Sequence, residues 1–280
     1  MQYSCLHTHT RFCDGHDDIE TFCEAAYRKG FASIGFSAHA PLPRSAGLRS
    51  DWHLREDRLE AYISEVRAAE QRWEGKIRVF LGLEADYISG IMSPADSYFQ
   101  SLDLDYLIGS VHYLVPPKGA PFTVDDAPEK FEQGLREGFS GDADALTGAY
   151  WDAVQAMIYA GGFAILGHAD LIRKNNAGNR WFSPESAAYR RRIESLTLPA
   201  PLVVEVNTGG MTRYAMPEPY PSLALLKRFR EMNIPAVITA DAHRAEHLDG
   251  HYEEARSLLL KAGYASAVLF NGETWIIDAL

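Results

Sequence analysis

Seven short apolar segments rich in Val, Ile, Leu and Phe recur along the chain, and longer amphipathic stretches separate most of them. Such segments predict parallel strands that are buried on both faces beneath covering helices. The expected strands end near His9, Ser37, Glu84, His112, His168, Asn207 and Asp241. Helices are expected over 18–29, 55–74, 147–160, 184–196, 221–232 and 252–262. This alternation predicts an α/β barrel of seven strands, similar to a TIM barrel.

The chain is expected to form one domain over residues 1–280, because this length is ordinary for an α/β barrel. Residues 115–145 are rich in Pro, Gly, Asp and Phe and interrupt the alternation, so we expect an excursion over the barrel mouth. Residues 266–280 carry an Asn-Gly pair between two apolar runs, which predicts a terminal hairpin.

Side chains that can bind metals stand at the C-terminal ends of the predicted strands, where α/β barrels place their active sites. His7 and His9 are one residue apart on a strand, so both can point to the same ion. Glu84 follows an apolar run, and a buried carboxylate there favours a cation as its partner. Asp14 and His16 follow in a nearby loop. The remaining strand-end candidates are His39, His112, His168, Asp241 and His243.

Each of these histidines could alone be an ordinary core or capping residue. Seven of the ten histidines occur at such positions, however, and this joint placement favours a metal site. His53, His247 and His251 have no strand-end context, and we interpret them as ordinary structural histidines.

Composition narrows the range of partners. The formal net charge is −11 and the Lys and Arg residues are scattered, so nucleic acid is not expected as a partner. The sequence shows neither a charged leader with an apolar stretch nor 18 uninterrupted apolar residues, which predicts a cytoplasmic protein without membrane contact. Cys5, Cys13 and Cys23 form no CxxC pair and are expected to be reduced thiols.

The motifs HTHT, DGH, SAHAP, GLEAD, GSVHY, GHADLIRK, EVNTGG and ADAH follow one another along the chain. In this order the sequence resembles the polymerase and histidinol phosphatase (PHP) superfamily, and within it the stand-alone histidinol-phosphate phosphatases. The similarity runs from residue 3 to about residue 245. It implies a distorted seven-stranded barrel with a trinuclear metal centre. It also implies hydrolysis of L-histidinol phosphate to L-histidinol and phosphate in histidine biosynthesis, by a metal-bound hydroxide.

The resemblance further implies which residues hold the three divalent ions. The first ion would be bound by His7, His9, Glu84 and Asp241. Glu84 would bridge to a second ion on His112 and His168, and the third would be bound by His16, His39 and His243. Asp14 is expected beside the ligands, not among them. Nitrogen and oxygen ligands without a thiolate suit Zn, Mn or Fe.

The expected substrate is a small phosphorylated metabolite. A phosphate monoester is a dianion, which arginine binds well with its forked guanidinium. Arg173 is the first choice because it follows His168 by five residues, and Arg213 and Arg11 are further candidates. Together with Asp241 and Glu84, Arg173 is expected to take part in catalysis. The sequence indicates no particular oligomeric state.

Three other hypotheses remain open. The substrate could be another small phosphate ester or an oligonucleotide end, although the acidic balance disfavours the oligonucleotide. Amidohydrolases also begin with an HxH strand and end with a strand-end Asp, but they usually bridge their metals with a modified lysine, where this chain has Glu84. A barrel kept only as a binding module is disfavoured by the intact set of ligands.

Overall fold

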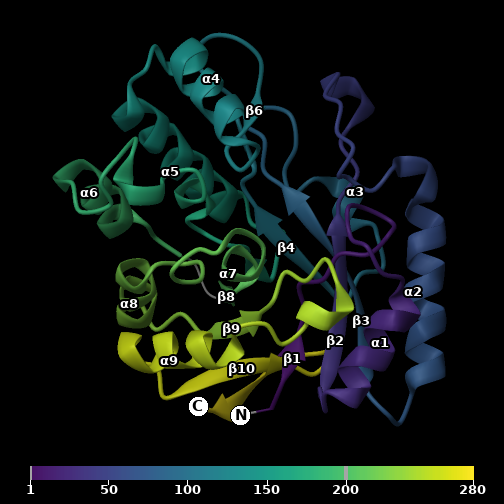
Figure 1. Ribbon diagram of the computed structural model, residues 1–280. Helices are drawn as coiled ribbons and strands as arrows, with labels where there is room; N and C mark the ends of the chain where they lie inside the picture. Colours follow the sequence, from purple (N-terminus) through teal and green to yellow (C-terminus); the bar gives the residue numbers. More distant parts are fainter. Residues whose placement is uncertain (1, 199–200) are drawn as a thin grey trace.

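A parallel sheet of seven strands organises the structure, a computed structural model that describes residues 2–198 and 201–280 (Figure 1). Its order is β1-β2-β3-β4-β7-β8-β9, and all neighbouring strands are parallel. The bounds are β1 Ser4–Cys5, β2 Ser33–His39, β3 Arg78–Asp86, β4 Tyr106–Ser110, β7 Ile165–Leu166, β8 Val203–Asn207 and β9 Ala236–Thr239.

The two edges of this sheet meet at the C-terminal ends of its strands. Thr8, just beyond β1, forms a parallel bridge with Ala242, just beyond β9. The N–H of His9 donates to the carbonyl of Ala242 at 2.9 Å, and the N–H of Ala242 donates to the carbonyl of His7 at 3.2 Å. The sheet is therefore a nearly closed barrel, which confirms the predicted fold class.

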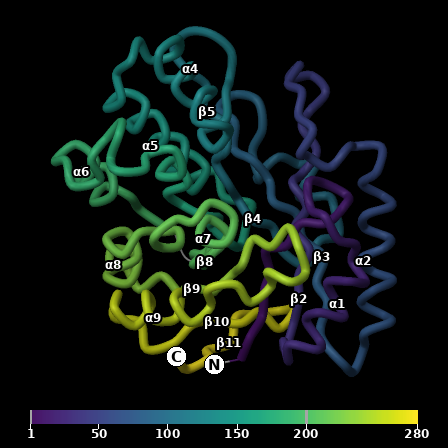
Figure 2. The backbone as a smooth tube through the Cα atoms, viewed as in Figure 1, coloured from purple at the N-terminus to yellow at the C-terminus, as the bar shows by residue number. Residues whose placement is uncertain are grey.

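Helices surround the barrel, and most of them lie where the amphipathic pattern predicts them (Figures 1 and 2). The predicted helices correspond to α1 Ile19–Arg28, α2 Leu59–Trp73, α5 Ala143–Ala160, α6 Ala187–Ser195, α8 Leu223–Glu231 and α9 Tyr252–Ala262. α5 begins four residues before the predicted start because the Asp142 side chain caps it by accepting from the N–H of Ala145 at 3.0 Å. The short helices α3 Ser97–Gln100 and α7 Gly209–Tyr214 were not predicted.

The segment 115–145 is more regular than its composition suggests. It follows β5 Tyr113–Leu114, which forms an antiparallel ribbon with β6 Phe122–Thr123, and it contains helix α4 Pro128–Phe139. Pro128 occupies the first turn of α4, a helix-start signal that the sequence interpretation overlooked.

The barrel interior is apolar at its N-terminal end and polar at its C-terminal end. Alternate residues of each strand point inward, so the inward row of β3 runs from Phe80 through Gly82 to Glu84. The apolar cluster contains Leu6, Phe80, Tyr106, Ile108, Ile165, Val203, Val237, Val268 and Phe270. A Cβ atom on Gly82 would lie 2.5 Å from the Tyr106 ring, so this inward position must be glycine for Tyr106 to fit.

A terminal hairpin packs against this apolar end. Strands β10 Ser266–Phe270 and β11 Trp275–Ala279 pair antiparallel, and the Phe270 ring lies 5.1 Å from that of Phe80. The backbone N–H of Gln2 donates to the Asp278 carboxylate at 2.6 Å, so the two ends of the chain lie side by side (Figure 2). Among the described residues, no helix has the length and apolar character needed to span a bilayer.

Candidate metal centre

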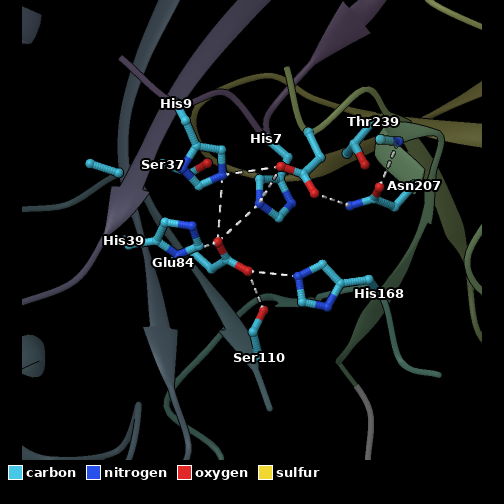
Figure 3. Close-up of polar contacts among 12 residues, drawn as sticks. His7, His9, Ser37, His39, Glu84, Ser110, His168, Asn207 and Thr239 are labelled. Atoms are coloured by element: carbon cyan, nitrogen blue, oxygen red, sulfur yellow. Dashed lines mark hydrogen bonds and ion pairs between the residues drawn. The ribbon is translucent and has the colours of Figure 1, made fainter. Parts of the chain in front are cut away.

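The carboxylate of Glu84 lies at the centre of a group of histidines at the C-terminal end of the barrel (Figure 3). Its Oε2 atom is 3.2 Å from Nε2 of His7 and 2.9 Å from Nδ1 of His39. Its Oε1 atom is 2.8 Å from Nε2 of His168 and 3.5 Å from Nε2 of His112, and it accepts a hydrogen bond from Ser110. The two carboxylate oxygens thus face two different sets of imidazoles.

His9 joins this group to the residues that follow β9. Its Nε2 atom lies 3.5 Å from Oε2 of Glu84 and 3.2 Å from Oδ1 of Asp241. Asp241 has a backbone φ of 47°, a conformation that residues other than glycine adopt at a cost of roughly 1–3 kcal/mol. This turn of the chain directs the Asp241 carboxylate towards His7 and His9, whose Nε2 atoms lie 3.8 and 3.2 Å away.

A second set of ligand atoms lies on the far side of His9. Oδ2 of Asp14 is 3.0 Å from Nε2 of His243, and Oδ1 of Asp14 is 3.8 Å from Nε2 of His39. The ligand atoms of Asp14, His9, His39 and His243 all lie within 4.8 Å of one another. Asp14 therefore belongs to the ligand cluster, although the sequence interpretation placed it only beside the ligands.

The structure does not bring His16 into this cluster. Its side chain is exposed, and its backbone N–H donates to the carbonyl of His243 at 2.8 Å. The loop therefore anchors itself through the His16 backbone while it directs Asp14 inward. A Cβ atom on the intervening Gly15 would lie 2.1 Å from the carbonyl oxygen of His9, so only glycine permits this tight fold of the loop.

The donor atoms fit divalent cations. Several buried atoms of the cluster have no hydrogen-bond partner: Nε2 of His7, Nε2 of His9, Nδ1 of His39, Oδ1 of Asp14 and Oε2 of Glu84. Buried polar groups are almost always paired, so this convergence of unpaired atoms calls for a ligand between them. Four overlapping groups of these side chains have ligand atoms close enough for one ion. The cluster is therefore a binding site for divalent metal ions.

The electrostatics agree with this conclusion. Burial opposes the charge of Glu84, but the neighbouring His7, His39 and His112 outweigh it and hold the pKa of the carboxyl well below its usual range. Burial likewise opposes the charge of Asp241, and Arg213 and His7 hold its pKa low. Carboxylates that stay ionised while buried create a negative potential, which attracts metal cations as well as protons.

Two further buried carboxylates, which sequence reasoning missed, contact the Nδ1 atoms of ligand histidines. Glu205 on β8 contacts Nδ1 of His7 at 2.8 Å, and Asp86 on β3 contacts Nδ1 of His112 at 2.8 Å. Asp86 also contacts Nε2 of His53 at 2.9 Å, so His53 is packed behind the cluster, as its interpretation as a structural histidine implies. A carboxylate on the Nδ1 atom leaves Nε2 free for a metal, the usual arrangement at histidine-ligated sites.

A cavity of about 870 Å³ opens beside the cluster. Its walls include Asp14, His39, His112, His168 and Asp241, together with residues from the excursion and the loop 49–52. Arg213 also lines it, where the guanidinium donates to Oδ2 of Asp241 at 2.8 Å and lies within 3.0 Å of the His243 ring nitrogens. Lys174 lines the same wall, with its ammonium 3.9 Å from the centre of the Tyr214 ring.

Arg173 and Arg11 do not line this cavity in the described structure. Arg173 is largely buried and forms ion pairs with the buried Asp170 at 3.1 Å and with the partly exposed Glu218 at 2.5 Å. Arg11 is largely exposed and pairs with Asp18 at 2.6 Å. Of the three arginines that the sequence suggests for binding phosphate, the structure places Arg213 at this cavity and the other two away from it.

Known relatives cover most of the chain. It is 29% identical over 252 residues to a probable histidinol-phosphatase of Deinococcus radiodurans, with 89% of each protein covered. It is 27% identical over 268 residues to the histidinol-phosphatase of Bacillus subtilis, covering 90% of this chain and 98% of that one.

Solved structures share the fold. A putative histidinol phosphatase from Listeria monocytogenes superposes with a TM-score of 0.80 at 21% identity, covering 90% of this chain and 99% of the other. Histidinol phosphate phosphatase from Lactococcus lactis, solved with zinc, L-histidinol and phosphate, superposes with a TM-score of 0.62 at 21% identity over 99% of both chains. The family model of the PHP domain matches residues 6–209 of the chain. This part contains all the clustered residues except the two that follow β9. With its barrel, its histidine and carboxylate cluster and this match, the chain belongs to the PHP domain family.

Proposed function

We propose that this chain is a metal-dependent phosphatase that hydrolyses L-histidinol phosphate to L-histidinol and phosphate. The observation that carries the proposal is the convergence of unpaired, buried ligand atoms beside a cavity that Arg213 also lines. The two curated relatives, both named as histidinol-phosphatases, match about nine tenths of this chain and support the choice of substrate.

Three divalent ions, each zinc, manganese or iron, are proposed for the cluster. The first would be held by His7, His9, Glu84 and Asp241, and the second by Glu84, His112 and His168. The third would be held by Asp14, His39 and His243, with Asp14 in the place that the sequence had assigned to His16. Every proposed donor is nitrogen or oxygen, which suits these metals.

Bound divalent ions would acidify a water molecule into a nucleophile and offset the negative charge of the phosphoryl group. The protein's own residues would orient the ester. Arg213 lies beside Asp241 at the edge of the cluster, where its forked guanidinium can bind two phosphoryl oxygens. Lys174 adds a second positive charge to the same wall. These two cations would hold phosphorus in line for attack.

The rest of the cavity suits an organic cation. Asp51, Asp125 and Asp126 line it, and carboxylates there can bind an ammonium group. The rings of Trp52 and Tyr113 stack with centres 5.8 Å apart and an interplanar angle of 16°, and both face the cavity. A flat aromatic or imidazole ring can pack against such a pair.

A single panel of assays tests this proposal. The purified protein would be incubated with L-histidinol phosphate, with other phosphate monoesters and with an oligonucleotide carrying a terminal phosphate, while metal content is measured on the same sample. We expect release of phosphate from L-histidinol phosphate at a kcat/KM well above that for the other esters. Equal rates on all monoesters would overturn the substrate assignment, and metal-loaded protein without phosphatase activity would overturn the proposed function.

A further inference from the structure

Strand β8 differs from the other barrel strands in what it brings to the metal centre. Among the described residues, each other strand carries or leads into a side chain whose ligand atom lies in the cluster, whereas β8 contributes none. The inward positions of β8 at this height are Glu205 and Asn207, both fully buried. A buried glutamate in the middle of an apolar strand is costly unless it is well paired, so its surroundings need an explanation.

Glu205 is paired entirely with donors. Its Oε2 contacts Nδ1 of His7 at 2.8 Å and accepts from the hydroxyl of Thr239 at 2.8 Å. Its Oε1 accepts from the backbone N–H of His168 at 2.6 Å and from the side-chain amide of Asn207 at 2.9 Å. Four donors on two oxygens match the acceptor capacity of an ionised carboxylate. An ionised carboxylate can only accept hydrogen bonds, so the Nδ1 atom of His7 must carry the proton in its contact with Glu205.

Asn207 extends this contact to a third ligand. Its Nδ2 atom donates to Glu205 and also lies 3.3 Å from Oδ2 of Asp241. The N–H of Gly209 donates to Oδ1 of Asn207 at 2.9 Å, which determines which way the amide faces. In the view of Figure 3, Asn207 and Thr239 lie on the opposite side of His7 from Glu84.

The ligand atoms of His7, His168 and Asp241 lie within 4.8 Å of one another, and the Glu205–Asn207 pair contacts all three of these proposed ligand residues. We propose that Glu205 is a positioning residue. It holds His7 as the tautomer whose Nε2 is free for a metal, and with Asn207 it sets the spacing of these three ligands. The inference rests on the metal-binding part of the proposed function, and it assigns to β8 the role of supporting ligands of two neighbouring ions.

The substitution Glu205→Gln separates this role from simple packing, because it keeps the size of the side chain. Each partner of Glu205 is a donor, so the new NH₂ group must face either His7 and Thr239 or His168 and Asn207. The backbone N–H of His168 cannot turn into an acceptor, whereas the Thr239 hydroxyl can rotate and the His7 ring can exchange its tautomer. The amide is therefore expected to face His7, which then carries its proton on Nε2 and loses its metal-binding atom.

The experiment measures zinc binding and imidazole tautomers instead of turnover. Zinc would be titrated into the metal-free protein in competition with a chromophoric chelator, for the wild type and for Glu205→Gln. We expect about a 10- to 100-fold weaker affinity in the variant for the zinc ions that share His7 and His168. In the zinc-loaded wild type, nitrogen NMR should show His7 with its proton on Nδ1, and this signal should be lost in Glu205→Gln.

Asp105→Asn provides the matched control. Asp105 accepts from the backbone N–H of Leu81 at 2.7 Å and from Arg67 at 2.9 Å, so it braces the barrel without contacting any proposed ligand. This variant should melt earlier than the wild type while it binds zinc with unchanged affinity. If Glu205→Gln does not fold, Asn207→Ala carries the test, with a zinc affinity expected below that of the wild type.

Unchanged zinc affinity in a folded Glu205→Gln protein would overturn the inference and leave the proposed function standing. An equal loss of zinc in Asp105→Asn would also overturn it, because the effect would then follow stability alone. Failure of the wild-type protein to bind zinc, manganese or iron would overturn the proposed function itself and this inference with it.

Discussion

Glu84 connects the two halves of the metal centre, since each of its oxygens faces a different set of imidazoles. We predict that Glu84→Gln loses metal and activity together, because a neutral amide cannot screen the repulsion between two cations as a carboxylate does. The barrel should still fold, because the apolar cluster at its N-terminal end does not include this side chain. Metal analysis and circular dichroism of the purified variant check the prediction, and full metal content with normal turnover would exclude the bridging role.

The loop after β1 offers a paired test of ligand identity. Asp14 is partly buried with a carboxylate oxygen 3.0 Å from His243, whereas His16 is exposed. Asp14→Ala is therefore predicted to lower the metal content by up to one ion per chain, and His16→Ala to leave it unchanged. Elemental analysis of both variants after identical purification measures this difference. The reverse pattern would restore His16 as the ligand.

Arg213 and Arg173 should differ in which property they control. Arg213→Ala is predicted to reduce kcat/KM by about 30- to 1000-fold, or roughly 2–4 kcal/mol, through loss of a charge-assisted contact to phosphate. Arg173→Ala instead leaves the fully buried Asp170 without its ion-pair partner, which is expected to cost about 3–5 kcal/mol of stability. Kinetics, metal content and melting temperature of both variants distinguish these roles. A purely kinetic effect of Arg173→Ala would show that it reaches the substrate after all.

At the scale of elements, the hairpin β10–β11 matters for stability and lies away from the chemistry. The Phe270 ring packs against Phe80 and Trp275 at the apolar end of the barrel, opposite the metal centre. Phe270→Ala is predicted to lower the free energy of unfolding by about 3 kcal/mol, because it opens a cavity in this cluster. The control is Ile277→Ala on β11, whose residue is 80% exposed and whose loss should cost under about 0.5 kcal/mol.

Urea unfolding of both hairpin variants, with kcat/KM measured alongside, checks this prediction. Both should keep the wild-type kcat/KM under conditions where they are folded. A fall in kcat/KM in folded Phe270→Ala would mean that packing of the hairpin affects the arrangement of the ligand cluster at the other end of the barrel.

For the whole molecule, stability should depend on metal concentration. The cluster packs Asp14, Glu84 and Asp241 among ligand histidines, and bound cations would stabilise only the folded arrangement of these side chains. At a metal concentration of 100 times Kd, each ion adds about 2.7 kcal/mol. This corresponds to roughly 5–10 °C in melting temperature for a chain of this size.

Removal of metal with a chelator should therefore lower the melting temperature, and restored zinc or manganese should raise it again. Differential scanning calorimetry over a series of metal concentrations measures the shift. A melting temperature that does not depend on metal would contradict the assignment of the cluster as a metal site.

Much of the architecture could be predicted from local patterns. Apolar segments of strand length alternate with amphipathic ones, and this alternation alone indicates a parallel barrel with its polar residues at one end. His7, His9, His39, Glu84 and Asp241 were identified because each stands where such a strand ends, and the structure brings them together. Helix α4 was not predicted because the Pro, Gly and Asp residues around it were interpreted as signs of an irregular segment. Pro128 is instead the start of an amphipathic helix.

What the sequence determined by itself was therefore the fold class and most of the ligand cluster. The alternation of apolar segments predicts the barrel, and the ends of these segments locate the ligands. The tertiary structure decided which loop side chain turns inward, since the tight fold at Gly15 directs Asp14 and not His16 towards His243. It also decided which arginine lines the cavity, because Arg173 pairs instead with Glu218, which is distant in the sequence, and with the nearby buried Asp170. The contacts of Glu205 depend on the position of β8 beside the other strands, since its partners come from β9 and from the segments that follow β1 and β7. Contacts between residues so distant in sequence leave no local pattern, so only the folded chain reveals them.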